Sequence, residues 1–312
     1  MPHAHDRAHC TPNLNALSYR FAVCCDDESM GAHVNSVLAG LRDHSAEGEG
    51  GADHSAEGEG ARAPHRYSLT ASPGRDGALD LARDGELVEP GLGPADAVGW
   101  LVWDVNRLAA EQSGQHLLFH AGGLEADGTG VLVPGASGSG KSTLTAGLAR
   151  AGLGYLSDEL VALELDGAVP GRLLPYPKAI TLKPGSFAVL AEMGPDPLGE
   201  GRGGEWQVPV GDGTGRRVGE PCAPGFVIAP RYDGAAETAL TSLSETEAFF
   251  TLALHAVNLL SHGASGSAAL GRLAADCECY ALTFSDLDEA CALVLGLVDA
   301  RVEPGSRRRG TG

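Results

Sequence analysis

The feature that most constrains the fold is a glycine-rich octet that stands between an apolar run and a helical pattern. It reads G-A-S-G-S-G-K-S over residues 135–142, after the apolar residues 131–133 and before a stretch with Leu144 and Leu148 on one face. Strand, G-x-x-x-x-G-K-S and helix in this order are typical of a phosphate-binding loop. A chance Gly/Ser-rich turn is the alternative in a chain with 45 glycines, but it does not explain why all three parts occur together.

Each part of the octet has a role in binding phosphate. Glycines let the backbone curl so that N–H groups point inward, and the helix that begins near Lys141 directs the positive end of its dipole to the same place. Lys141 is expected to reach the β- and γ-phosphates, and the Ser142 hydroxyl to hold Mg²⁺. The predicted nucleotide contacts are Gly135, Ala136, Ser137, Gly138, Ser139, Gly140, Lys141, Ser142 and Thr143.

Composition narrows the class of protein. With 312 residues, of which 43% are apolar and 20% charged, the chain reads as a soluble globular protein of one large domain or two ordinary ones. The net charge of −19 argues against a nucleic-acid-binding surface. There is no apolar run of transmembrane length and no signal-peptide pattern, so we expect a cytoplasmic protein that binds neither nucleic acid nor membrane.

The seven cysteines are an odd number scattered along the chain, and they predict no disulfide framework. Cys24 and Cys25, like Cys277 and Cys279, lack a second ligand pair at zinc spacing. We therefore expect reduced, mostly buried thiols. His3, His5, His9 and Cys10 offer ligands for adventitious metal, but a polar tail is the favoured interpretation.

Residues 1–13 are predicted to be a disordered tail and residues 14–114 a small α/β domain. Strands are expected at 17–25, 67–71, 78–82 and 86–88, with Asp84-Gly85 as the hairpin turn before the last of them. Helices are expected to begin near residues 26 and 94. The octet D-H-S-A-E-G-E-G at 43–50 recurs unchanged at 53–60. Such a repeat cannot bury a core, so residues 43–60 are predicted to form a disordered acidic loop.

Residues 115–300 are predicted to be the catalytic α/β domain, followed by a disordered tail at 301–312. Its first strand, 117–120, is expected to form a hairpin through Asp127-Gly128 with the strand that feeds the octet. The Gly/Pro-rich segment 194–219 is expected to be mobile. A capping box at 244–247 predicts a helix that runs to Leu260. The residues G-A-S-G-S at 263–267 are interpreted as a helix-break loop, before a final helix that begins near residue 285.

The side chains that face the γ-phosphate decide the reaction. Asp158 and Glu159 follow Lys141 by one helix and one turn, so they are expected at the end of a strand beside the loop strand. One acid can hold Mg²⁺ and the other can accept the proton of an attacking hydroxyl; a helix cap or solvated turn is the alternative. His120 is either a satisfied core histidine or a functional group on the hairpin.

Three further cations are candidate contacts to phosphate or substrate. They are Lys178, Lys183 and Arg231. Solvated surface positions are the favoured alternative for all three.

Three segments together resemble the catalytic domain of HPr kinase/phosphorylase and its HPr-kinase-related relatives. They are H-A-G at 120–122, the octet at 135–142 and L-S-D-E at 156–159. The resemblance spans approximately residues 117–182. It implies a P-loop kinase domain of the HPr kinase/PEP carboxykinase-like type, which binds ATP with Mg²⁺ and forms a homo-oligomer. It also implies Asp158 as the general base for a serine hydroxyl, Glu159 as the Mg²⁺-side acid in place of a family aspartate, and His120 as an auxiliary group near the reacting phosphate.

The leading hypothesis is therefore a Mg-ATP-dependent phosphotransferase that acts on a hydroxyl, serine of a protein or peptide. A kinase for a small molecule is one alternative. A regulatory protein that binds ATP and does little chemistry is another. A GTP-dependent switch ranks lower, because the chain lacks an N-K-x-D segment that would read guanine.

Overall fold

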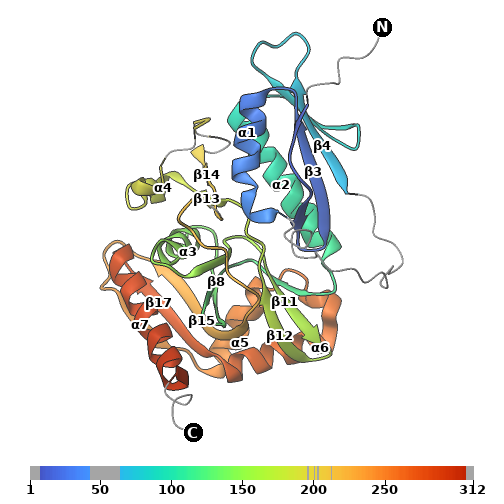
Figure 1. The fold of residues 1–312 in the computed structure, drawn as a ribbon. Coiled ribbons are helices and arrows are strands. Elements are labelled where there is room, and N and C mark those ends of the chain that lie inside the picture. The colour runs from blue at the N-terminus through green and yellow to red at the C-terminus, as the bar shows by residue number, and fades with distance from the viewer. Residues whose placement is uncertain are drawn as a thin grey trace.

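The computed structural model describes residues 8–42, 64–194, 197–199, 201, 204–211 and 213–306. These residues form a mixed α/β structure with four sheets (Figure 1), which confirms the α/β class. The predicted acidic loop at 43–60 lies outside the described residues, as do residues 1–7 and 307–312. Among the helices described, none is both long enough and apolar enough to cross a membrane.

The first sheet is built from the N-terminal third of the chain, in the order β1-β3-β4-β5-β6 with β2 paired to β3. Its strands are β1 (His9–Cys10), β2 (Leu14–Ala16), β3 (Tyr19–Cys25), β4 (His65–Ala71), β5 (Leu79–Arg83) and β6 (Glu86–Leu92). Buried and half-buried residues alternate along β3, so one face of the sheet carries the core. Helices α1 (Glu28–Val37) and α2 (Pro94–Gln112) contribute buried apolar residues to that core.

Local signals in this region are confirmed. Asp27 caps α1 by accepting a hydrogen bond from the Met30 N–H at 2.8 Å, and Pro94 begins α2. The turn between β5 and β6 has positive φ at Asp84 (52°) and Gly85 (83°), as a two-residue hairpin turn requires.

The cysteine prediction is wrong at one place. Cys10 and Cys24 stand opposite each other in the antiparallel pair β1–β3 and form a disulfide. Residues 9–10 are thus a strand and not part of a disordered tail, because the bridge and the pairing hold them to β3. The five other cysteines, Cys25, Cys222, Cys277, Cys279 and Cys291, are free and buried as expected.

We expect the Cys10→Ser variant to unfold with a free energy about 3 kcal/mol lower than the wild type, because the bridge closes a short loop in the unfolded chain. Urea unfolding followed by circular dichroism measures the difference. Reductant should lower the stability of the wild type by a similar amount and leave Cys10→Ser unchanged. A wild type that is insensitive to reductant would show that the bridge contributes nothing.

The second sheet carries the octet and has the order β10-β8-β9-β15-β17-β16. Its strands are β8 (Ala121–Ala126), β9 (Thr129–Pro134), β10 (Gly154–Ser157), β15 (Ala223–Tyr232), β16 (Ala239–Ser242) and β17 (Glu278–Phe284). Strand β9 is parallel to β15, which is parallel to β17. Strand β8 is antiparallel to both of its neighbours, so β10 runs in the direction of β9.

Two predictions about this sheet need correction. The strand that pairs with β9 is β8, and residues 117–119 belong instead to a separate strand, β7, paired with β11. Strand β10 lies two positions from β9, with β8 between them. The expected turn at Asp127-Gly128 is present, with φ values of 47° and 80°.

Helices and a small sheet cover the two faces of the second sheet. Helices α3 (Lys141–Arg150) and α7 (Leu287–Ser306) share one apolar cluster with it. Helices α5 (Glu245–His255) and α6 (Leu259–Asp276) share another, together with the three-stranded sheet of β7 (Leu117–Phe119), β11 (Val161–Asp166) and β12 (Val169–Leu174). Beside α3 lie the two-stranded sheet β13 (Ile180–Leu182) with β14 (Trp206–Val208) and the short helix α4 (Pro184–Phe187). The segment predicted to be mobile therefore contains a strand, β14.

Helix boundaries in the C-terminal part differ from prediction. The capping box of α5 is present at Ser244 and Glu247, but α5 ends at His255 because the next residues turn toward β7. The break predicted at 263–267 is a kink at Gly263 inside α6. Helix α7 continues to Ser306, past the predicted end of the domain at residue 300. The division of the chain into two domains stays a prediction.

Candidate functional site

The octet lies at the carboxyl end of β9 and leads directly into α3. Gly140 caps α3 in the left-handed conformation, with φ 89°. A Cβ at this position would lie 2.6 Å from Cζ of Phe284, so the position requires glycine. The Ser139 N–H donates to the Ala136 carbonyl at 3.1 Å, and the Tyr232 N–H donates to the Ser139 carbonyl at 2.9 Å. The end of β15 thus holds the loop in place.

One polar atom in the loop is buried without a partner. The Ser139 hydroxyl is shielded from solvent and has no hydrogen-bond partner in the structure. An unpaired buried hydroxyl costs free energy unless a ligand satisfies it. Ala136, Ser137 and Gly138 are exposed at the same turn, so an incoming anion has access. This donor fits the phosphate group of a nucleotide.

Lys141 is the lysine of the octet, and its ammonium group is buried. Its Nζ donates to the backbone carbonyl of Asp158 at 2.7 Å. Burial lowers the pKa of Lys141, and Asp158 and Glu159 oppose that shift while Lys178 and Lys183 add to it. The predicted neighbourhood of Lys141 and the acid pair is therefore confirmed, even though β10 and β9 are not adjacent strands.

Asp158 follows β10 and is only 1% exposed. Its Oδ1 accepts hydrogen bonds from Lys178 Nζ at 2.6 Å and from the Tyr155 hydroxyl at 2.8 Å. Its Oδ2 accepts from the Thr181 N–H at 3.0 Å. Lys178 is itself 1% exposed. The Asp158 carboxylate is thus half of a buried ion pair that ties β10 to β13, and its role as a base stays a prediction.

Glu159, the second residue of the acid pair, is partly exposed to solvent, and His120 lies beside it. His120 lies between β7 and β8, where its N–H donates to the His255 carbonyl at 2.8 Å. Its Nδ1 lies 3.2 Å from the Glu159 carbonyl oxygen and 3.3 Å from Glu159 Oε1. Both side chains are half-buried. With acceptors on the Nδ1 side, the proton of neutral His120 is assigned to Nδ1 and Nε2 is an acceptor.

The groups around Glu159 favour the ionised form of its carboxyl group. Burial alone would raise the pKa of Glu159, but the hydrogen bond with His120 and the positive charges of Lys178 and Lys141 outweigh it and lower this pKa to about 2. Glu159 is therefore ionised at neutral pH.

The described residues contain no group of three or more His, Cys, Asp or Glu side chains placed to hold a metal ion. Mg²⁺ does not need such a cage, since it is commonly bound by one or two protein oxygens, water and substrate phosphates. Ser142 in the first turn of α3 and the ionised Glu159 fit this pattern.

The other candidate residues lie around the loop, and each has a different hydrogen-bond or ion-pair partner. Lys183 is exposed, with Nζ 3.5 Å from Ser137 Oγ and 4.0 Å from Glu205 Oε1. The Thr143 hydroxyl shares a 2.6 Å hydrogen bond with the Ser186 hydroxyl. Arg231 is exposed and pairs with Asp233 at 3.3 Å, next to the residue whose N–H holds the loop. Lys183 is thus placed to reach a ligand on the loop.

Sequence reasoning missed the partner of Asp158. Lys178 was interpreted as a surface residue, but it is buried against that carboxylate. A signal was present, because the chain has three lysines in all. Each has its Nζ on a group of this site: the Asp158 carbonyl, the Asp158 carboxylate and the Ser137 hydroxyl.

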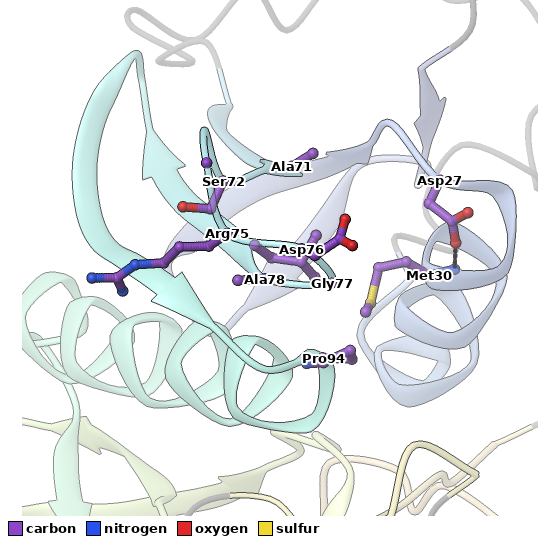
Figure 2. A pocket seen from close by; sticks show the side chains of 11 residues that line it. Asp27, Met30, Ala71, Ser72, Arg75, Asp76, Gly77, Ala78 and Pro94 are labelled. Atoms are coloured by element: carbon purple, nitrogen blue, oxygen red, sulfur yellow. Dashed lines mark hydrogen bonds between the residues drawn. The ribbon is translucent and has the colours of Figure 1, made fainter.

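A cavity of about 550 Å³ lies elsewhere, in the N-terminal part of the chain (Figure 2). It is lined by the start of α1, the β4–β5 connection and Pro94. Two of its polar side chains are engaged or directed away. Asp27 caps α1, and the guanidinium of Arg75 lies against Gly91, extended away from Met30 in Figure 2. The chemistry-bearing residues therefore lie at the loop and not at this cavity.

Comparison with known proteins adds little to this geometry. No protein-family model and no curated protein matches the chain. Among solved structures, the HPr(Ser) kinase/phosphatase from Coxiella burnetii matches 60% of this chain and 98% of its own, at 12% identity and a TM-score of 0.28. This likeness is weak, and the function proposed below rests on the residues of the site.

Proposed function

We propose that the chain is an ATP-dependent phosphotransferase that transfers the γ-phosphate to a hydroxyl, serine of a protein or peptide. The observation that carries the proposal is the junction of the loop with the acid pair. The buried ammonium of Lys141 is bonded to the backbone of Asp158, directly before the ionised Glu159. Cation, acid and phosphate-binding turn thus lie together, as phosphoryl transfer requires.

The loop binds and orients the nucleotide. Backbone N–H groups at the start of α3, the free Ser139 hydroxyl and Lys141 bind the phosphate oxygens. Ser142 and Glu159 are the residues that would hold Mg²⁺, which would neutralise charge on the phosphates. Lys183 reaches the outer side of the turn through Ser137.

The acceptor hydroxyl attacks the γ-phosphorus, the bond to the β-phosphate oxygen breaks, and the hydroxyl proton passes to a base. The resemblance assigns that role to Asp158. Its carboxylate is occupied by Lys178, Tyr155 and Thr181, so it takes the proton only if Lys178 releases it. His120 is the second candidate, because Nε2 is the nitrogen not turned to Glu159.

The test is transfer of label from γ-labelled ATP and Mg²⁺ to synthetic peptides that each contain one serine, with alanine-for-serine peptides as controls. We expect label on the serine peptides only. Replacing the true base should lower the transfer rate by about 10²–10⁴-fold. Asp158→Asn and His120→Gln, measured side by side, show which group that is.

Two outcomes would contradict the proposal. A wild type that binds labelled ATP but modifies no serine peptide and hydrolyses no ATP would be a binding module. Equal labelling of serine and alanine peptides would exclude serine as the acceptor.

A further inference from the structure

A cluster of apolar side chains is exposed where α5 passes into α6. Phe250 (61% exposed), Leu254 (82%), Val257 (56%) and Leu260 (96%) are four of the ten large apolar residues exposed in the described part of the chain. Apolar residues scattered singly over a surface are ordinary, whereas four within residues 250–260 mark a candidate interaction site. We call these four residues the α5–α6 patch.

The backbone under the patch is held in place, so its exposure is not that of a frayed end. The Val257 N–H donates to the Leu118 carbonyl at 2.7 Å. Asn258 accepts from the Leu118 N–H at 2.9 Å and donates to the His116 carbonyl at 2.8 Å. Beyond it, α6 kinks at Gly263, with φ 53°, so the first turn of α6 is set off from the rest of the helix. The structure thus presents Leu260 on a fixed support.

The helix that carries the patch ends at the candidate site. The residue after Leu254 is His255, whose carbonyl accepts from the His120 N–H. Burial lowers the pKa of His255, and its proximity to His120 and Lys141 lowers this pKa further. A polypeptide that docks on the patch thus lies on the element whose last residue, His255, contacts His120.

Charge and size indicate what covers the patch. Residues 248–271 contain no Asp, Glu, Lys or Arg, although the chain carries a net charge of −19. Two copies of so acidic a chain repel each other. Four side chains are also few beside the roughly 20–30 residues per partner of a stable interface. Both observations favour a short segment of a different polypeptide.

We infer that the α5–α6 patch docks the polypeptide substrate, through apolar side chains that flank the acceptor serine. This inference rests on the proposed function and adds the class of sequence that the site selects. Docking on the patch holds the serine at the loop and contributes to KM. The patch residues do not touch the reacting groups, so kcat does not depend on them.

The test uses two series of short synthetic peptides with one central serine, flanked by Leu and Phe in one series and by Asp and Gly in the other. Binding is measured without ATP, and phosphoryl transfer is measured with it. We expect wild type to prefer the Leu/Phe series in both. The variant Leu254→Gln/Leu260→Gln should lose this preference in binding, and its KM should rise about tenfold with kcat unchanged. The variant Val169→Gln/Val189→Gln, in which two other exposed apolar residues are replaced, should behave as wild type.

The outcomes separate the docking surface from the chemistry. Equal binding of the two series by wild type, or a preference kept by Leu254→Gln/Leu260→Gln, would overturn the inference. Light scattering that shows a wild-type dimer and a monomeric Leu254→Gln/Leu260→Gln variant would assign the patch to a second copy instead. Selective binding without label transfer would support the docking surface and contradict the proposed function.

Discussion

The Lys141→Met variant is expected to lose ATP-dependent phosphoryl transfer by about 10²–10³-fold or more, because it removes the buried ammonium to which the proposed function assigns the phosphates. Methionine keeps most of the volume and flexibility of the side chain. Transfer from γ-labelled ATP to a serine peptide measures the effect, and circular dichroism shows whether the variant is folded.

The matched control is Lys183→Met, the same substitution at the exposed edge of the same site. Its Nζ is 3.5 Å from Ser137 Oγ, and solvent screens it, so its effect should be smaller by at least an order of magnitude. If Lys141→Met binds ATP and transfers phosphate as the wild type does, the octet is not the phosphate site.

The second large effect concerns stability. Lys178→Met and Asp158→Asn should each lower the free energy of unfolding by about 3–5 kcal/mol, because each leaves an uncompensated charge in a buried place. The double variant Asp158→Asn/Lys178→Met removes both charges and should recover most of the loss. Urea unfolding of the four proteins closes a double-mutant cycle.

An exposed pair supplies the comparison. Arg172 and Glu164 lie 2.9 Å apart on the neighbouring strands β12 and β11, but both side chains are open to solvent. Arg172→Met should therefore cost far less stability than Lys178→Met. Equal losses for Arg172→Met and Lys178→Met would show that the Asp158–Lys178 pair is not a buried anchor.

The double variant also decides the role of Asp158 in catalysis. If this carboxylate only anchors β10 to β13, activity should return together with stability. If Asp158 accepts the proton of the acceptor, the double variant should be folded and inactive. Recovered activity would leave His120 as the candidate base, and a folded, inactive double variant would leave Asp158.

The features that the sequence predicted correctly depend on residues that are neighbours along the chain. The octet between β9 and α3, the capping box at Ser244 and the turn at Asp84-Gly85 each follow from a few adjacent residues. Their geometry is set by local backbone preferences, which the residue types report directly.

What the sequence did not predict depends on contacts between distant segments. Three features join elements that local patterns do not relate. They are the position of β8 between β9 and β10, the bridge from Cys10 to Cys24 and the pairing of Lys178 with Asp158. The acid pair reached Lys141 all the same, because β10 runs in the direction of β9 and ends at the same edge of the sheet. The position of His120 beside Glu159 likewise depends on the pairing of β7 with β11.

The scarcity of lysine has a consequence for chemical labelling. Of the three lysine side chains, those of Lys141 and Lys178 are enclosed and that of Lys183 faces solvent at the rim of the loop 135–142. An amine-directed acylating reagent thus finds one open side-chain amine on the whole polypeptide, at the mouth of the proposed nucleotide site. The rate of acylation at Lys183 therefore reports whether a bound ligand covers the mouth of this site. No reporter group has to be introduced into the chain.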